Sequence, residues 1–347
     1  MYKSIDELVE RIDERNSDGK ISTLIGVSID KCFINSVANI NGTDLTKYKI
    51  IRRDDFAVSL MQVSRDSKIP IARLKDYDQA IMSPAYPIFR VRDTSVILPE
   101  YLEMWFMRPE FDREAAFIAV GGVRGSMPWE EFAKMRLPVP SLEKQHQVVR
   151  AYQIVADRIA IKRRINDNLE AVLAASHSKM FFSKDTSEHT KLGELMTFGN
   201  GKSRPKTDGP IPVYGGNGVL SYTDHHNIEN TVLIGRVGAY CGSVYLEQGI
   251  CWVSDNAIFA KSKITKDEFF DYFLLKRLNL FNHHVGTGQQ LLTQEILNNI
   301  EVPKPVTEQI ELFNRKAASV FETIFTNSRE IIRLQELSDL LLSRLAG

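Results

Sequence analysis

The sequence predicts an α+β protein built from two similar halves, each a mixed α/β domain followed by a long helix. Three observations support this prediction: a motif pair that occurs twice at one spacing, a heptad pattern after each copy, and short strand-like runs separated by Gly, Pro, Asp and Ser. We expect the two long helices to pair as an antiparallel coiled coil, which gives the chain an internal pseudo-twofold axis.

The motif pair is a glycine-rich segment followed by a Pro-x-Pro sequence. The first copy is Gly121-Gly122-Val123-Arg124 with Leu137-Pro138-Val139-Pro140, and the second is Gly286-Thr287-Gly288-Gln289 with Val302-Pro303-Lys304-Pro305. Both members of the second copy lie 165 residues after those of the first. One offset for both motifs indicates an internal repeat.

Residues 1–140 are predicted to form the first domain. The expected elements are a helical stretch at 5–12, strands that include 56–60 and 87–91, and a helix at 101–117. Residues that favour turns end each strand-like run. The pattern is typical of a curved sheet with few helices.

Residues 184–305 are predicted to form the second domain, which begins with a short polar link. The expected elements are strands at 231–234, 242–246 and 257–259 and a helix at 268–280. This order of strands and helix repeats the plan of the first domain.

Residues 141–183 and 306–347 are predicted to be the two long helices. Ser141 and Thr307 stand at their starts, where a hydroxyl can accept a hydrogen bond from an unpaired backbone N–H. Seam residues then recur at alternating steps of three and four. The seam positions are Val148, Tyr152, Val155, Ile159, Lys162, Asn166, Leu169, Leu173, Ser176 and Met180, then Ile310, Phe313, Ala317, Val320, Ile324, Asn327, Ile331, Leu334, Ser338, Leu341 and Leu345. Adding 165 to each position of the first seam gives a position of the second.

Asn166 and Asn327 are polar residues at seam positions near the middle of these helices. Antiparallel pairing about the twofold axis places them opposite each other. A buried amide without a partner costs on the order of 1–3 kcal/mol, so mutual hydrogen bonding would favour this register over slipped ones. The alternative is that both amides point to water, with Lys162 one turn away.

Composition and charge limit the possible classes of protein. The 44 basic and 44 acidic residues balance, so contact with nucleic acid would have to come from local basic loops. The chain start lacks the features of a signal peptide, and no apolar run approaches the roughly 20 residues that span a bilayer. We therefore expect a cytoplasmic protein. Cys32, Cys241 and Cys251 lack the spacing of a disulfide framework or zinc site, which favours buried, reduced thiols.

Several short motifs resemble catalytic ones, but each lacks a required residue. The run at 199–203 would need glycine at position 196 to be a phosphate loop, and Met196 stands there. The chain has no Pro-Pro pair, so it lacks the Asp/Asn-Pro-Pro-aromatic motif of adenine methyltransferases. His225-His226 and His283-His284 lack the spacing of a helical metal-ligand pair, and we expect them in solvated loops. The sequence thus predicts no catalytic residue, metal or cofactor in this chain.

Basic and glycine-rich loops are the candidates for a binding site. Arg can read guanine, and Asn or Gln can read adenine, through paired hydrogen bonds, whereas Lys suits phosphates. For any one residue, a solvated loop is an equally good interpretation; recurrence in both copies favours contact. The candidate DNA-binding residues are Arg65, Lys68, Arg124, Lys202, Arg204, Lys206, Asn217, Arg236, Gln289 and Gln290.

The ordered set of these features resembles the specificity subunit of Type I restriction-modification systems. The doubled arrangement and the Pro-x-Pro helix openings carry the resemblance over nearly the whole chain. Residues 211–218, followed by 234–238, are similar to one class of target-recognition domain, and residues 39–48 are similar to another. Lys144 departs from the usual opening of the first long helix because it separates the Glu and Gln residues there.

The resemblance implies that residues 1–140 and 184–305 are two target-recognition domains, each of which reads one half of a bipartite site in double-stranded DNA. The long helices would hold the halves at a fixed spacing. It also implies protein partners: two methyltransferase subunits, which bind S-adenosylmethionine and flip the target adenine, and restriction subunits for ATP-dependent cleavage. Catalysis would then lie in the partners.

Two other classes of function are compatible with the sequence. One is a fragment of a Type II restriction enzyme or a nuclease with an unrecognised active site, which predicts DNA cleavage or methyl transfer by the purified chain. The other is a structural coiled-coil adaptor, which predicts no sequence-specific DNA binding.

Overall fold

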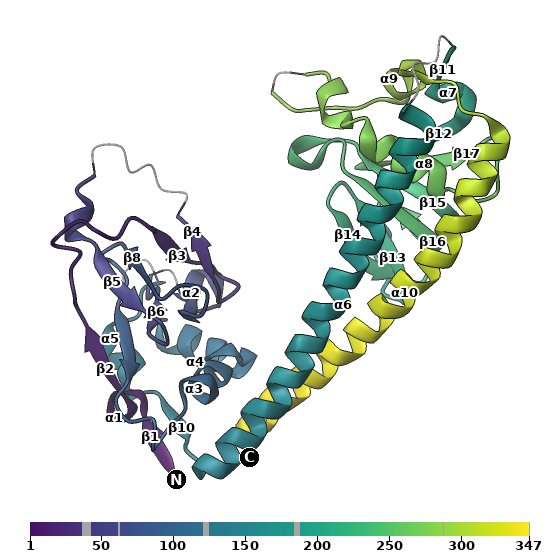
Figure 1. Cartoon of the computed structure of the whole chain (residues 1–347). Coiled ribbons are helices and arrows are strands. Elements are labelled where there is room, and N and C mark those ends of the chain that lie inside the picture. Colours follow the sequence, from purple (N-terminus) through teal and green to yellow (C-terminus); the bar gives the residue numbers. More distant parts are fainter. Residues whose placement is uncertain (37–42, 62, 121–124, 184–187, 287, 347) are drawn as a thin grey trace. The chain divides into compact units, whose positions relative to one another are not determined.

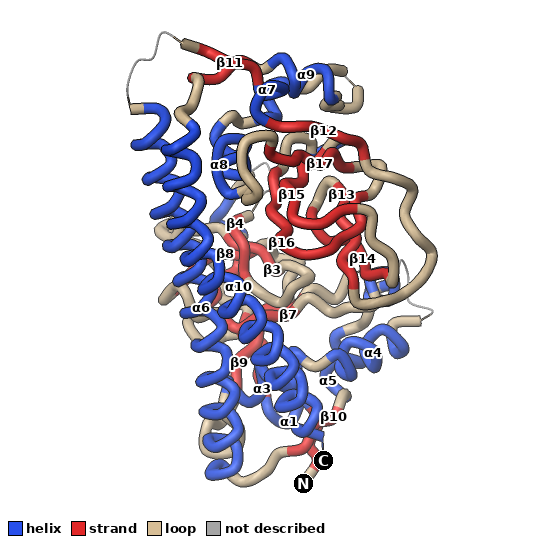
Figure 2. Tube along the Cα trace, turned by 90° about the vertical axis from the view of Figure 1, so that its right-hand side faces the viewer, coloured by secondary structure: helices blue, strands red, loops and turns tan. Residues whose placement is uncertain are grey.

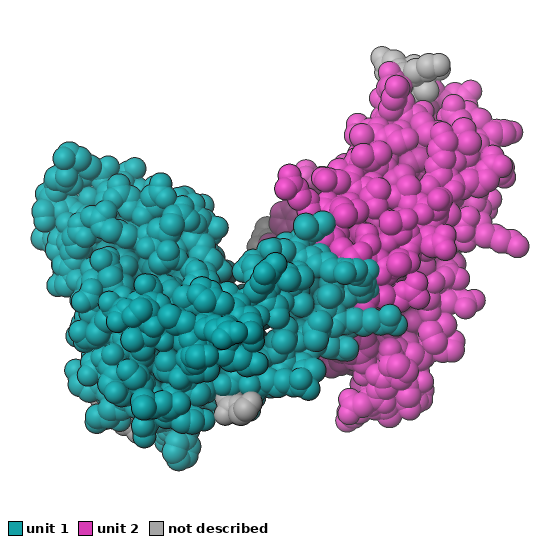
Figure 3. Space-filling model, turned by 60° about the horizontal axis from the view of Figure 1, so that its bottom comes forward, with its two compact units in different colours: residues 1–161, 330–347 teal, residues 162–329 magenta. Residues whose placement is uncertain are grey.

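The computed structural model describes the chain except residues 37–42, 62, 121–124, 184–187, 287 and 347. The chain forms two compact units (Figure 3). Unit 1 comprises Met1–Ile161 and Glu330–Gly347, and unit 2 comprises Lys162–Arg329. Each unit contains one globular domain and parts of both long helices (Figure 1).

The first domain has small antiparallel sheets and short helices (Figure 2). A four-stranded sheet has the order β2 (Val9–Ile12), β9 (Ile88–Val91), β6 (Phe56–Val58), β7 (Ile71–Arg73). Two further pairs are β3 (Ile25–Val27) with β4 (Phe33–Asn35) and β5 (Lys49–Arg52) with β8 (Gln79–Met82). The helices are α1 (Ile5–Leu8), α2 (Val63–Asp66), α3 (Pro99–Met107), α4 (Pro109–Ile118) and α5 (Trp129–Lys134).

The prediction of an opening helix at residues 5–12 is wrong beyond the first turn. Only α1 is helical, and the chain continues directly as β2, which pairs with β9. Glu7 completes a capping box at the helix start, where its Oε2 accepts the Ser4 N–H at 2.8 Å. Strand pairing buries Val9 and leaves Glu10 exposed, so long-range pairing decides the conformation of residues whose spacing also fits a helix.

The predicted helix at 101–117 is in fact two helices, α3 and α4. The break lies at Arg108, whose ψ of 135° is extended. Pro109 explains the break, because its ring disfavours helical backbone in the residue before it. Arg108 is buried, and its guanidinium lies 4.1 Å from the centroid of the Trp105 ring.

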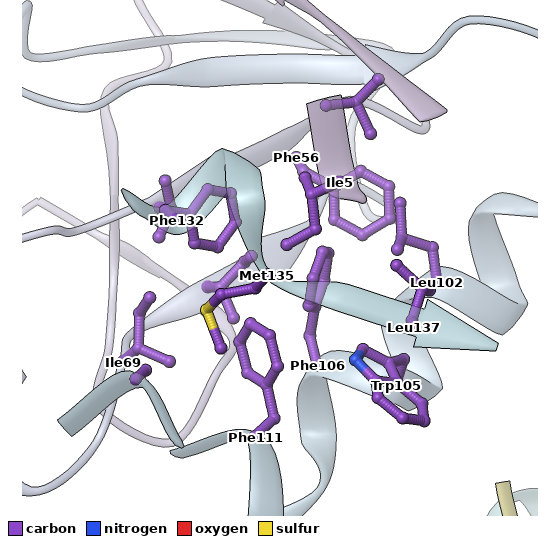
Figure 4. Close-up of a cluster of buried hydrophobic side chains, with 14 of the residues drawn as sticks. Ile5, Phe56, Ile69, Leu102, Trp105, Phe106, Phe111, Phe132, Met135 and Leu137 are labelled. Atoms are coloured by element: carbon purple, nitrogen blue, oxygen red, sulfur yellow. The ribbon is translucent and has the colours of Figure 1, made fainter. Parts of the chain in front are cut away.

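The core of the first domain is rich in aromatic side chains (Figure 4). Phe106 lies edge-on to Phe56 and Phe89, with centroid distances of 5.7 and 6.2 Å. Such edge-to-face pairs stabilise a core beyond the effect of buried area. Leu342 and Leu345 are buried in the same core, so the last turns of the chain belong to the fold of unit 1.

The second domain is built on one six-stranded sheet. Its order is β12 (Met196–Asn200), β17 (Ala257–Ser262), β15 (Ile228–Gly235), β16 (Val244–Val253), β13 (Ile211–Gly215), β14 (Gly218–Thr223). Neighbours are antiparallel except β13 and β16, which are parallel. The helices are α7 (Leu192–Leu195), α8 (Phe269–Arg277) and α9 (Gln294–Asn299). The predicted strands at 231–234 and 257–259 lie in β15 and β17, the predicted strand at 242–246 overlaps β16 only from Val244 onward, and the predicted helix corresponds to α8.

Both domains close in the same way, by pairing their first and last strands. β1 (Tyr2–Ser4) pairs with β10 (Arg136–Pro138), and β11 (His189–Lys191) pairs with β18 (Glu301–Pro303). The Ile5 N–H donates to the Met135 carbonyl at 2.9 Å, and the Leu192 N–H donates to the Ile300 carbonyl at 2.9 Å. The two acceptors are repeat-equivalent, so the internal repeat persists at the domain ends although the sheets differ.

The long helices are α6 (Leu142–Phe182) and α10 (Thr307–Ser343). They pair antiparallel as predicted: Arg158 forms an ion pair with Glu330 in unit 1, and Asn166 contacts Asn327 in unit 2. The predicted seam side chains are all buried or half-buried, which confirms the heptad pattern. Neither these helices nor any other that the structure describes is long and apolar enough to cross a membrane.

A polar layer interrupts the seam where the two asparagines meet. Asn327 Nδ2 donates to Asn166 Oδ1 at 2.8 Å, which confirms that the amides face each other. Lys162 joins them, because its ammonium donates to Asn327 Oδ1 at 2.9 Å. Lys162 and Asn327 are repeat-equivalent, so this layer lies at the pseudo-twofold axis.

We expect Asn327→Leu alone to destabilise the coil and Asn166→Leu with Asn327→Leu to recover part of the loss. The single change takes a partner from Asn166 and Lys162, at a cost on the order of 1–3 kcal/mol, whereas the double change substitutes apolar contact and removes the register constraint. Denaturant unfolding of both single variants and the double variant measures the coupling. Additive effects would contradict mutual satisfaction of the amides, and an unaltered DNA spacer preference in the double variant would contradict a role in register.

A buried amide near the start of each long helix ties that helix to its domain. Gln145 on α6 accepts the Leu98 N–H at 2.9 Å, and Asn314 on α10 accepts the Phe270 N–H at 2.8 Å. Each amide also donates to two oxygens of its own domain at 2.9 Å. The accepted N–H groups lie at the starts of α3 and α8, where helical partners are lacking. Gln145 and Asn314 are not repeat-equivalent, so two different positions supply the same contact.

We expect Gln145→Leu to lower the free energy of unfolding by about 1–3 kcal/mol, because the Leu98 N–H stays buried and loses its acceptor. Asn314→Leu should do the same in unit 2. Gln147→Leu is the matched control, since Gln147 is exposed on the same helix, and it should change stability by less than about 0.5 kcal/mol. Equal stability of the Gln145 and Gln147 variants in thermal unfolding would refute the role of the buried amide.

The cysteines differ in part from expectation. Cys241 and Cys251 are buried free thiols as predicted, but Cys32 is exposed. It lies in the turn between β3 and β4, with its Sγ 3.1 Å from Ser28 Oγ. A hairpin turn holds its residues at the surface, which the residue type alone does not indicate.

Candidate nucleic-acid interface

Two of the predicted loops of the second domain meet at one edge of its sheet. Arg236 follows β15, and its backbone N–H donates to the Asn256 carbonyl at 3.0 Å. Two residues later, the Gly238 N–H donates to the Gln290 carbonyl at 3.0 Å. Gln289, directly before Gln290, is exposed. The structure therefore brings Arg236 and the two glutamines together from separate segments.

Asn217 and Lys202 lie beside the same loops. Asn217 is exposed in the turn between β13 and β14. The turn packs closely, because a Cβ on the neighbouring Gly216 would lie 3.6 Å from the Asn256 carbonyl oxygen. Lys202 follows β12 and its backbone N–H donates to the Val253 carbonyl at 3.0 Å. Four loops thus contribute Lys202, Asn217, Arg236 and Gln290 to one edge of the domain.

Arg204 and Lys206 continue the loop that begins at Lys202, and all three side chains are exposed. The far end of the loop is tied to the sheet by the Thr207 and Thr223 hydroxyls, which lie 2.9 Å apart. Three cations therefore stand on one surface loop with both ends fixed. Such an arrangement suits a run of phosphates.

Tyr214, the aromatic residue of the glycine-rich turn, points into the domain. Its hydroxyl donates to Glu247 Oε2 at 2.9 Å, and burial together with the nearby Glu247 carboxylate raises the pKa of Tyr214. Tyr240 is instead the exposed aromatic at this edge, 50% accessible and close to Gly216. The sequence motifs did not single out Tyr240; its place four residues after Arg236, in the same glycine-rich loop, was the available signal.

In the first domain, Arg65 and Lys68 are exposed at α2 and just after it. Arg65 forms an ion pair with Asp66 at 2.7 Å; both groups face solvent, so the pair is weak. Arg124 lies outside the described residues. A Cβ on Gly125 would lie 3.3 Å from the Arg65 backbone nitrogen, so the chain after Arg124 runs beside α2.

Two buried carboxyl groups, Glu268 and Asp271, lie at the start of α8 and could suggest acid-base chemistry. Burial raises the pKa of both groups. Glu268 accepts the Ser262 N–H at 2.8 Å and pairs with Lys261 at 2.6 Å. These contacts join α8 to β17, so the geometry favours a structural role.

The histidine pairs also lack the geometry of a metal site. His225, His226 and His283 are exposed, and His284 is half-buried beside the Phe281 ring. Among the residues that the structure describes, no group of three or more His, Cys, Asp or Glu side chains could hold a metal ion.

Comparison with known proteins agrees with this architecture. Residues 184–340 match the family model described as the Type I restriction modification DNA specificity domain. A solved Type I restriction-modification S subunit from M. genitalium is similar over 100% of this chain and 96% of its own, with 15% identity and a TM-score of 0.61. No curated protein matches the chain.

Two further solved structures align over the length of the chain. One, described as showing complex assembly and conformational transition of the type I R-M system, has 16% identity, coverage of 99% and 97%, and a TM-score of 0.45. The other, an HsdS subunit from Thermoanaerobacter tengcongensis, has 16% identity, coverage of 100% and 96%, and a TM-score of 0.37. Residues 184–340 therefore carry a Type I restriction modification DNA specificity domain, and the whole length of the chain has the fold of an S subunit.

Proposed function

We propose that the chain is the DNA-binding specificity subunit of a Type I restriction-modification complex and reads a bipartite site in double-stranded DNA. The observation that carries this proposal is the doubled architecture, in which two domains close by the same strand pairing and each is tied to a long helix by a buried amide. Each domain reads one half of the site, and the paired helices set the spacing. The chain recognises DNA and leaves the chemistry to its partners.

In the second domain, Arg236, Asn217 and the Gln289-Gln290 pair face base edges. This assignment is supported by their convergence at one edge of the sheet and by their ability to form paired hydrogen bonds with bases. Lys202, Arg204 and Lys206 contact the flanking phosphates, since they are exposed cations on a neighbouring loop.

In the first domain, Lys68 contacts phosphates, and Arg65 and Arg124 contact DNA. This assignment is supported by the approach of Gly125, the residue after Arg124, to the backbone of Arg65. Arg65 must exchange its weak ion pair with Asp66 for a DNA contact.

The protein partners are two methyltransferase subunits and restriction subunits, and α6 carries a face suited to docking a methyltransferase subunit. Four apolar residues of α6 are exposed at heptad spacing outside the seam. They are Ile154 (59%), Ile161 (58%), Ile165 (41%) and Val172 (67%). The repeat-equivalent positions of α10 are Ser319, Thr326, Glu330 and Leu337, so α6 alone has the full stripe. A helix of the partner can cover such a stripe as another strand of a helical bundle.

Co-expression with the cognate methyltransferase subunits, followed by genome-wide mapping of methylated adenines, tests the function. A bipartite motif methylated only in the presence of the chain is expected. Ile161→Asp should remove the methyltransferase subunit that docks on α6 from the co-purified complex, whereas Ile332→Asp, at a position 56% exposed on α10, should not. The absence of a chain-dependent motif would overturn the proposal, and DNA cleavage by the purified chain would support the nuclease alternative.

A further inference from the structure

We infer that each domain carries an apolar wedge, Phe117 with Val120 in the first and Phe281 with Val285 in the second, which packs against bases of its half-site. The inference rests on the proposed function and deepens it by assigning base contacts to side chains that form no hydrogen bonds. Val120 and Val285 are separated by the 165-residue repeat, and each directly precedes the glycine-rich loop of its domain.

The first wedge lies at the end of α4. Phe111 and Ala115 bury the other face of this helix in the core, while Phe117 is 80% exposed and Val120 is 73% exposed. The side chain of Arg113 forms an exposed ion pair with Glu110 at 3.1 Å and is 68% exposed one turn before Phe117, so it lies on the same side of the helix. The exposed apolar surface is therefore accompanied by a cation that suits a phosphate.

The second wedge lies beside the loops that carry Arg236 and Gln290. Phe281 is 41% exposed and Val285 is 48% exposed. Val285 and Leu291 exchange two backbone hydrogen bonds, at 2.9 and 3.0 Å, which close the base of the loop between them. Leu291 also bridges to the residue after Arg236, so Val285 is fixed at the proposed DNA-reading edge.

The recurrence in both domains favours a common ligand. A single exposed apolar side chain is ordinary, but the sheets of the two domains differ, the exposed valines are repeat-equivalent, and an exposed phenylalanine lies three or four residues before each of them. Duplex DNA fits both places because cations flank the apolar residues. Apolar side chains can contact thymine methyl groups or enter a base step and unstack it.

The wedge is tested in the assembled methyltransferase complex on DNA that contains the mapped target. Phe117→Ala and Phe281→Ala should each reduce specific affinity by roughly tenfold or more and relax only one half-site. The slope of log affinity against log salt should stay unchanged, because every cation that faces a phosphate is still present. Tyr77→Ala, at a position 38% exposed in the first domain, is the control and should bind normally.

Specific affinity within about twofold of wild type for both phenylalanine variants would overturn the wedge. Loss of methyltransferase subunits from either variant would also overturn it, since the patch would then be a protein-docking surface. A wild-type complex that binds no specific site would refute the proposed function itself. Thermal unfolding of the variants should match wild type, because the replaced side chains are exposed.

Discussion

Exchange of residues 1–140 for the same region of a related chain is expected to change one half of the DNA site and to leave the other half and the spacing unchanged. The first domain closes on itself because β1 pairs with β10, and β10 ends just before α6 begins. Each mismatched base pair typically costs about 1–3 kcal/mol. Replacing a whole half-site therefore changes the affinity for the original site, relative to that for the new site, by several orders of magnitude. Mapping of methylated adenines for the chimera measures the outcome.

The core of the first domain sets a condition on this exchange. Leu342 of α10 and Leu345 in the turn after it are buried in this core, and the Gln145 side chain accepts a hydrogen bond from the Leu98 N–H. The domain taken from the related chain must therefore have a core that accommodates Leu342 and Leu345, and a backbone N–H that can donate to the Gln145 side chain. The reciprocal exchange of residues 184–305 is the control and should change the other half-site. If either exchange altered both half-sites, independent reading would be wrong.

Combined replacement of Lys202, Arg204 and Lys206 by alanine is expected to weaken binding to every DNA sequence alike. The three cations are exposed on one loop, and removing each cation that binds a phosphate should reduce the slope of log affinity against log salt by about 0.9. Affinity at physiological salt should fall by roughly tenfold or more. Binding titrations of the assembled complex over a range of salt, on target and unrelated DNA, measure both quantities.

A charge-matched variant separates this loop from a general effect of net charge. Arg315, Lys316 and Arg329 are exposed on α10, and their replacement by alanine should leave the salt slope nearly unchanged. Equal slopes for wild type and the loop variant would remove the loop from the interface. Loss of Arg236 alone should instead cost about 1–3 kcal/mol and relax one base position.

The long helices could be predicted almost completely from the sequence because their information is local. A heptad seam, its offset of 165 and the polar positions Asn166 and Asn327 are sufficient to give the pairing and its register. The seam spacing predicts only that Lys162 lies one turn away from Asn166. Its hydrogen bond to Asn327 depends on the reach of its side chain in the assembled coil.

The break at Arg108 also has a local cause. Pro109 is visible in the sequence, and its effect on the preceding residue is local. The error at residues 9–12 is of another kind, since β2 exists because it pairs with β9, far along the chain. Periodicity within a short segment cannot reveal a distant partner strand.

The sequence by itself determined the repeated plan, the two helices and their register, and the residue types suited to DNA. Only the tertiary structure decided that Lys202, Asn217, Arg236 and Gln290 share one edge, and that Tyr214 turns inward while Tyr240 faces solvent. The physical reason is that helix pairing follows a regular local spacing. The position of a loop, in contrast, depends on which strands pair, and those pairings join residues far apart in the chain.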